Sequence, residues 1–140
     1  MYRCLIVADD LTGANASGVL LKTFGFSPLT LTSDLPPPTA VHAGRDALIV
    51  PTDSRAVAPT VAYQRVRDAT AALATPEVCL YTKRIDSTLR GNVGPEIDAM
   101  LDGLAAVENS DRLAVVVPAY PQAGRVAVGG YLLVNGILLQ

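Results

Sequence analysis

The chain has 140 residues, of which half are hydrophobic and only 17% are charged. This composition excludes a disordered chain, and a formal net charge of −2 argues against a broad nucleic-acid-binding surface. No uninterrupted apolar run is longer than that from Leu113 to Val117, which is far too short to cross a bilayer. Neither a nucleic acid nor a membrane is therefore expected as a partner. Because Asp9 and Asp10 interrupt the first apolar run, we predict no signal peptide and a cytoplasmic location.

Apolar runs alternate with polar breaks and helical patterns along the chain, as in an α/β fold. The first run is continuously apolar, which is typical of a strand that is covered on both faces. We therefore expect a three-layer, mostly parallel sheet of about five strands with helices on both faces. The predicted strands are Arg3–Ala8, Pro28–Thr32, Ala47–Val50, Val78–Tyr81 and Leu113–Val117, and the predicted helices span about 12–24, 59–74 and 94–107.

Two segments fall outside this alternation. Residues 33–46 contain three consecutive prolines and are predicted to form a surface loop. Asn135-Gly136 separates two apolar runs, Tyr131–Val134 and residues 137–140. Because both residues of this dipeptide tolerate the left-handed backbone of a tight turn, the tail is predicted to be a β-hairpin.

Polar side chains gather directly after four of the predicted strands. Because the carboxyl ends of parallel strands meet at one edge of a sheet, we expect these clusters to converge on one site. Five of the eleven cations are among them, beside several carboxylates, which suits a small anion that also carries hydroxyl groups. The clusters are Asp9, Asp10 and Thr12; Thr52 to Arg55; Lys83 to Asn92; and Tyr120, Gln122 and Arg125.

Three known kinds of site were tested against these spacings. The glycine-rich stretch from Gly124 to Gly130 lacks the lysine and hydroxyl of a P-loop. The haloacid-dehalogenase pattern requires a second aspartate where this chain has Leu11. A receiver-like signalling domain phosphorylated on Asp53 stays an alternative, although the lysine of such a domain follows its fifth strand and Lys83 follows the fourth predicted strand.

Three segments resemble the four-carbon acid sugar kinase family, once known only as a domain of unknown function. They are residues 8–15 (ADDLTGAN), 83–92 (KRIDSTLRGN) and 118–125 (PAYPQAGR), the last continuing through residues 129–136 (GGYLLVNG). A weaker fourth segment is TDSR at residues 52–55. The order and spacing of the segments also match, and the resemblance covers essentially the whole chain.

The resemblance implies a division of labour in which an amino-terminal domain binds the sugar acid and a separate carboxyl-terminal domain binds the nucleotide. Family members phosphorylate acids such as threonate and erythronate with ATP, so ATP and Mg²⁺ are implied for the full-length family. Residues 1–140 correspond to part of the sugar-acid-binding domain. We therefore expect no cofactor or metal to bind this chain alone, and no kinase activity from it alone. The alternative within the same class is a stand-alone sugar-acid-binding module without catalysis.

The resemblance also implies roles for individual residues. Asp9 and Asp10 are candidates for the base that deprotonates the attacking hydroxyl. Arg90, with help from Lys83 or Arg125, is expected to hold the carboxylate of the sugar acid. The full set of predicted substrate-binding residues is Lys83, Asp86, Ser87, Arg90, Gly91, Asn92, Arg125 and, from the weaker segment, Arg55.

The chain departs from the family pattern at two positions that bear on function. Ala16 stands where the family usually has an acid, and Leu132 stands where it often has a histidine. Both changes affect groups that could contact a substrate, so they bear on substrate choice. The stretch from Tyr131 to Leu139 is very apolar, and a homodimer that covers it is an open alternative.

Overall fold

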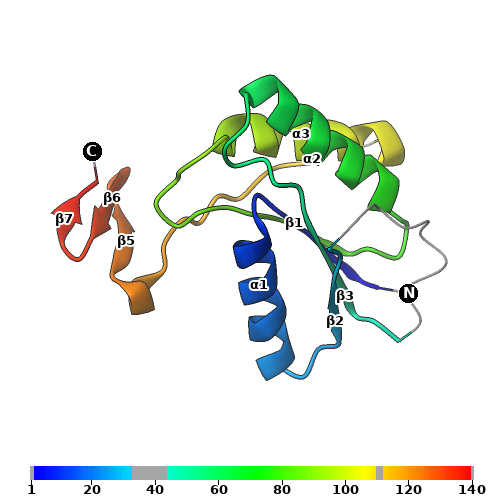
Figure 1. The fold of residues 1–140 in the computed structure, drawn as a ribbon, viewed down its shortest axis with the longest axis horizontal. Helices are drawn as coiled ribbons and strands as arrows, with labels where there is room; N and C mark the ends of the chain where they lie inside the picture. Colours follow the sequence, from blue (N-terminus) through cyan, green and yellow to red (C-terminus); the bar gives the residue numbers. More distant parts are fainter. Residues whose placement is uncertain (1, 33–43, 110–111, 140) are drawn as a thin grey trace.

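The computed structural model describes residues 2–32, 44–109 and 112–139. Its strands form two sheets (Figure 1). A four-stranded parallel sheet has the order β2-β3-β1-β4, and a three-stranded antiparallel sheet, β5-β6-β7, follows it. The α/β class with a parallel sheet is thus confirmed. The elements are β1 (Cys4–Ala8), α1 (Leu11–Thr23), β2 (Pro28–Thr30), β3 (Ala47–Pro51), α2 (Pro59–Leu73), β4 (Leu80–Arg84), α3 (Val93–Glu108), a short 3₁₀ turn (Pro121–Ala123), β5 (Arg125–Val128), β6 (Tyr131–Val134) and β7 (Ile137–Leu138).

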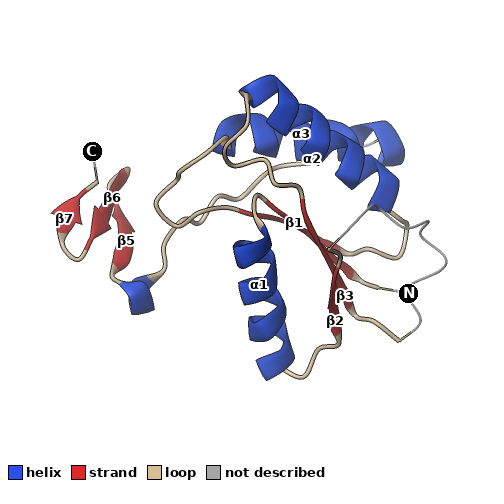
Figure 2. Cartoon of the chain, in the orientation of Figure 1, coloured by secondary structure: helices blue, strands red, loops and turns tan. Residues whose placement is uncertain are grey.

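Helices cover both faces of the parallel sheet, with α1 on one side and α2 and α3 on the other (Figure 2). Alternate residues of the central strand β1 serve the two sides. Leu5 and Val7 belong to the cluster with α2 and α3, whereas Ile6 packs on the α1 side. Because successive side chains of a strand point to opposite faces, a strand buried on both sides has to be apolar throughout. Burial on both faces therefore explains the continuous apolar run from which this strand was predicted.

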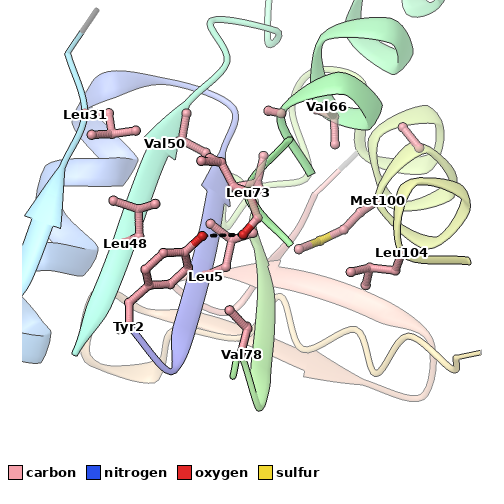
Figure 3. Close-up of a cluster of buried hydrophobic side chains, with 13 residues drawn as sticks. Tyr2, Leu5, Leu31, Leu48, Val50, Val66, Leu73, Val78, Met100 and Leu104 are labelled. Atoms are coloured by element: carbon pink, nitrogen blue, oxygen red, sulfur yellow. Dashed lines mark hydrogen bonds between the residues drawn. The ribbon is translucent and has the colours of Figure 1, made fainter. Parts of the chain in front are cut away.

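The larger core lies between the sheet and helices α2 and α3 (Figure 3). Leu5 and Leu48 from the sheet face Leu73 from α2 and Met100 from α3 there. Tyr2 reaches across this core, and its hydroxyl donates a hydrogen bond to the carbonyl oxygen of Leu73. The burial of these side chains holds α2 and α3 against the sheet and so fixes where α3 begins.

Helix α1 lies close to the sheet because its buried residues are small. Gly13, Ala14 and Gly18 are its buried residues. A Cβ added at Gly18 would stand 3.3 Å from Cδ1 of Ile49, so a larger side chain would push the helix outward. The small residues of the first half of this helix therefore bring its N-terminus to the edge of the sheet where the polar clusters gather.

Two predicted strands need correction. Leu113–Val117 pairs with no strand among the described residues, and its large side chains are 49–97% exposed. An apolar run reports a tendency to be buried, but a strand also needs a partner for its backbone hydrogen bonds. The fourth strand runs from Leu80 to Arg84 rather than from Val78 to Tyr81, because its ladder with β1 continues to the pair Ala8–Arg84.

The C-terminal hairpin is confirmed, with Asn135 at a φ of 52° in its turn. We did not predict β5, which pairs antiparallel with β6 and extends the hairpin to a three-stranded sheet. Of the predicted loop at residues 33–46, residues 33–43 lie outside the described part of the chain, as does Gln140 at the predicted end of the hairpin. Within the described residues, no helix has the length and apolar character needed to span a membrane.

Candidate functional site

The core of the candidate site is an ion pair between two strand ends. Asp9 follows β1, and Arg55 lies in the loop after β3. The guanidinium of Arg55 donates to both carboxylate oxygens of Asp9, from Nε at 2.7 Å and from Nη2 at 3.0 Å. The hydrogen bond to Asp9 raises the pKa of Arg55. Asp9 is buried, so this two-pronged contact fixes the loop after β3 to the end of β1.

Asp10 joins the same guanidinium to the start of α1. Its Oδ1 accepts a hydrogen bond of 2.6 Å from the backbone N–H of Gly13, which makes it the N-cap of the helix. Its Oδ2 lies 2.5 Å from Nη1 of Arg55. Asp10 is partly exposed whereas Asp9 is buried, so Asp10 is the carboxylate of the pair that a ligand reaches more easily.

The loop after β4 carries a second ion pair. Asp86 accepts hydrogen bonds from Nε and Nη2 of Arg90, at 2.9 and 2.6 Å, and from the backbone N–H and the hydroxyl of Thr88. These bonds, above all that from Arg90, hold the pKa of Asp86 well below its ordinary value. The side chain of Arg90 is 67% exposed. Asp86 itself is only 11% exposed, so Arg90 is the member of the pair that an incoming anion can reach.

Gly91 and Asn92 connect the loop after β4 to the loop after β3. Gly91 has a φ of +88°, and a Cβ placed there would stand 2.9 Å from Cγ of Arg55 and 3.1 Å from its carbonyl oxygen. The side-chain amide of Asn92 donates to the carbonyl oxygens of Ser54 and Val57, at 2.8 and 2.9 Å. Both donors of Asn92 are thereby used within the protein, which leaves its amide oxygen for a ligand.

Lys83 forms a buried ion pair with a residue that the sequence did not predict. Its Nζ lies 2.6 Å from Oε2 of Glu96, and the two side chains are 6% and 1% exposed. Burial lowers the pKa of Lys83, while the negative charge of Glu96 opposes that effect. The sequence did carry a signal for Glu96, because it lies four residues before Met100 on the buried face of α3. An acid on an apolar helical face is the kind of residue that a pattern search should single out.

The structure brings most of the predicted residues together, although it tests none of their roles. Charges from all three strand-end loops influence one another, because Asp86 acts on Arg55 and both Asp9 and Asp10 act on Arg90. Ser87 is partly buried between Asp86 and Thr88. Arg125 stands apart on β5 in the C-terminal sheet (Figure 1), where its Nη1 donates to the carbonyl oxygen of Ala123.

The side chains at this edge have the chemistry to bind a small polyhydroxylated acid. No three His, Cys, Asp or Glu side chains in the described residues are grouped so as to hold a metal. Arginine and lysine offer charged donors to a carboxylate, whereas aspartate oxygens accept from hydroxyls. Of the two departures from the family pattern, Ala16 is exposed on α1 and Leu132 is buried in β6, so neither contributes a polar group to this edge.

Comparison with known proteins identifies the family. The family model described as "Sugar-binding N-terminal domain" matches residues 4–140. The chain belongs to this family. It is 54% identical over its whole length to a D-erythronate kinase of Heliobacterium modesticaldum, and 35% identical over 98% of its length to a D-threonate kinase of Salmonella typhimurium. The chain covers 31% of the length of each of these two relatives.

A solved structure shows the same fold. It is a domain of unknown function from Bordetella bronchiseptica, described as a domain-swapped dimer with bound citrate. The TM-score is 0.86 at 33% sequence identity, over 96% of this chain and 33% of the other. The resemblance of the sequence segments to this family is therefore confirmed, and the chain again spans about a third of the length of a longer relative.

Proposed function

We propose that this chain is the sugar-acid-binding part of a kinase that phosphorylates four-carbon sugar acids of the erythronate and threonate type. The observation that carries the proposal is the 54% identity, over the whole chain, to a D-erythronate kinase. The charged edge of the parallel sheet supports it independently, because it combines cations for a carboxylate with acceptors for hydroxyls. The citrate in the solved relative also supports a small acid as the ligand.

The contacts suggest which residues meet the ligand first. Arg90 is the most accessible cation of the cluster, with 67% of its side chain exposed, so we assign it to the carboxylate of the sugar acid. Arg55 is occupied on three of its donor atoms by Asp9 and Asp10, so we assign it to holding these carboxylates in place. Asp10 is the more accessible of the two and is the better candidate for the base.

Phosphoryl transfer itself is assigned to the longer protein. In this proposal ATP with Mg²⁺ binds outside residues 1–140, so the chain alone binds the acid and does not turn it over. Positioning and charge neutralisation supply most of the rate in phosphoryl transfer, and both require the nucleotide beside the acid. A stand-alone binding module is the alternative within this class. The family match lends no support to the receiver-like alternative at Asp53.

Calorimetry with D-erythronate and D-threonate tests the proposal directly. We expect the chain to bind at least one of them, and Arg90→Ala to weaken binding at least about tenfold through loss of a charge-assisted pair. Arg112→Ala is the matched control, because Arg112 also pairs with an acid four residues before it, Glu108, outside the cluster. If Asp10→Asn and Arg90→Ala both bind like the wild type, the site assignment is wrong. Turnover by the isolated chain with ATP would contradict the assignment of catalysis to the longer protein.

We also propose that the protein works in the cytoplasm as a homodimer. The solved relative is a domain-swapped dimer, and the exposed apolar side chains after α3 provide surface for a second copy. Sedimentation at two protein concentrations tests the dimer, and a monomer at both would overturn it.

A further inference from the structure

Glu96 is the one buried acid of the described residues whose carboxylate is only half satisfied. Its Oε2 contacts Nζ of Lys83, whereas its Oε1 is buried and has no hydrogen-bond partner among the described residues. Replacing a buried ion pair by apolar side chains is often neutral or stabilising, so stability alone does not account for such a pair. A buried ion pair next to a cluster of charges is a candidate for a functional role.

Glu96 is held rigidly with respect to the site. It lies in the first turn of α3, and its backbone N–H donates to the carbonyl oxygen of Asn92 at 3.0 Å. Asn92 is in turn anchored on Ser54 and Val57 in the loop after β3. The carboxylate of Glu96 therefore moves with the frame that positions Arg55, and it presents a fixed negative charge to Lys83.

Charged groups on three elements act on the ammonium of Lys83. Glu96 contacts it from α3, and the charges of Asp9, at the end of β1, and of Arg55, in the loop after β3, also act on it. Its ammonium also donates to the carbonyl oxygen of Arg84 at 3.2 Å. These two acceptors engage two of the three N–H groups of the ammonium, which leaves one donor without an acceptor among the contacts of the described residues.

We propose that Glu96 is a positioning residue that keeps the Lys83 ammonium charged and aimed at the carboxyl edge of the sheet, where it helps to bind the sugar acid. The inference rests on the proposed function. Burial alone would favour a neutral amine, and Arg55 adds repulsion, so the carboxylate of Glu96 supplies the opposing charge. Without Glu96, the Lys83 ammonium would lose its proton at a lower pH, and the contact that fixes the position of its Nζ would be missing.

The chain offers a direct spectroscopic test, because it contains only two lysines, Lys22 and Lys83. Isotope-labelled lysine gives one side-chain signal for each, and a pH titration follows their ionisation separately. In Glu96→Gln we expect the pKa of Lys83 to fall, with the signal of Lys22, on the last turn of α1, as the internal reference. In the control Glu108→Gln, which removes an exposed ion pair from the same helix, we expect neither lysine to change.

Binding of D-erythronate and D-threonate, measured by calorimetry over the same pH range, supplies the second readout. We expect Glu96→Gln to weaken binding at least about tenfold near neutral pH. As the pH rises, the affinity of the variant should also begin to decline at a lower pH than the affinity of the wild type does. On a Lys83→Met background, Glu96→Gln should add no further loss, because Glu96 acts through Lys83. Glu96→Asp, which keeps the charge, should bind more tightly than Glu96→Gln.

Several results would overturn the inference. Unchanged affinity and an unchanged Lys83 titration in a folded Glu96→Gln protein would refute it, as would equal losses from Glu96→Gln with and without Lys83. If Glu96→Gln does not fold, the wild type decides: affinity must fall as Lys83 loses its proton, and a flat profile across that titration overturns the inference. If the wild type binds neither acid, the proposed function itself fails. If the wild type binds one of them and a folded Glu96→Gln binds it equally well, only the inference about Glu96 fails.

Discussion

The carboxyl edge of the parallel sheet and the stretch from Arg112 to Leu139 are organised in opposite ways. At the sheet edge the carboxylates of Asp9, Asp10, Asp86 and Glu96 each contact a cation. In the C-terminal stretch, large apolar side chains are exposed on both Leu113–Val117 and the antiparallel sheet. The first region is held by contacts within the chain, whereas the second presents surface that these contacts do not cover. We therefore expect stability and ligand binding to depend on the first region, and association to depend on the second.

The largest effect should come from Asp9→Asn. This change removes the charge that holds Arg55 and leaves a partly buried guanidinium without its main partner. Breaking a buried ion pair costs about 3–5 kcal/mol, and because Arg55 is partly exposed we expect a loss of about 3 kcal/mol in the free energy of unfolding. Urea denaturation measures it. Glu108→Gln, at the exposed pair with Arg112, should cost less than about 1 kcal/mol, and equal losses would contradict the contrast between the regions.

Two glycines with nearly the same backbone provide the next test. Gly91 has a φ of +88° and Gly130 a φ of +84°, but only Gly91 has atoms crowded around a built Cβ. Both alanine variants pay the cost of a left-handed backbone, so their difference isolates the clash with Arg55. We expect Gly91→Ala to lower the free energy of unfolding by about 1–2 kcal/mol more than Gly130→Ala. An equal loss at both positions in urea denaturation would show that the loops after β3 and β4 are not tightly packed.

The contrast also explains what could be predicted from the sequence. The three helices and the strands β1 to β3 follow from hydrophobic periodicity and from breaks at polar residues, and the structure has them within about two residues. The convergence of three of the four polar clusters was predictable because a parallel sheet collects its strand ends at one edge. The fourth cluster, with Arg125, lies apart because Leu113–Val117 is not a strand of that sheet. The structure of Leu113–Val117 was not predictable, because an apolar run indicates that a segment tends to be buried but not which part of the protein covers it. The place of Glu96 on the apolar face of α3 was a signal in the sequence that our prediction missed, whereas its pairing with Lys83, on another element, is visible only in the folded chain.

A smaller effect is expected from the pH dependence of Asp86. Its pKa is lowered in the folded state, so the stabilisation that it provides is complete above the unfolded value of about 4 and is lost as the pH falls through the lower folded value. Asp86→Asn should therefore be less stable than the wild type at pH 7, by about 1 kcal/mol because Arg90 is exposed. The difference should shrink as the pH falls below about 4. A difference that is as large at pH 2 as at pH 7 in denaturation experiments would assign the loss to packing instead of charge.

The smallest effect on stability should come from the exposed apolar segment, where association is the informative readout. The side chains of Val115 and Val117 are exposed, so Val115→Ser and Val117→Ser should change the free energy of unfolding by less than about 0.5 kcal/mol. Sedimentation of the same variants should show weaker self-association than the wild type, because each change removes apolar surface that a second copy would cover. Val7→Ser is the matched control at a buried position, where the same substitution should destabilise the chain. A large loss of stability from Val115→Ser would mean that this segment packs against its own chain, as a fifth strand would, and the distinction between the two regions would then fail.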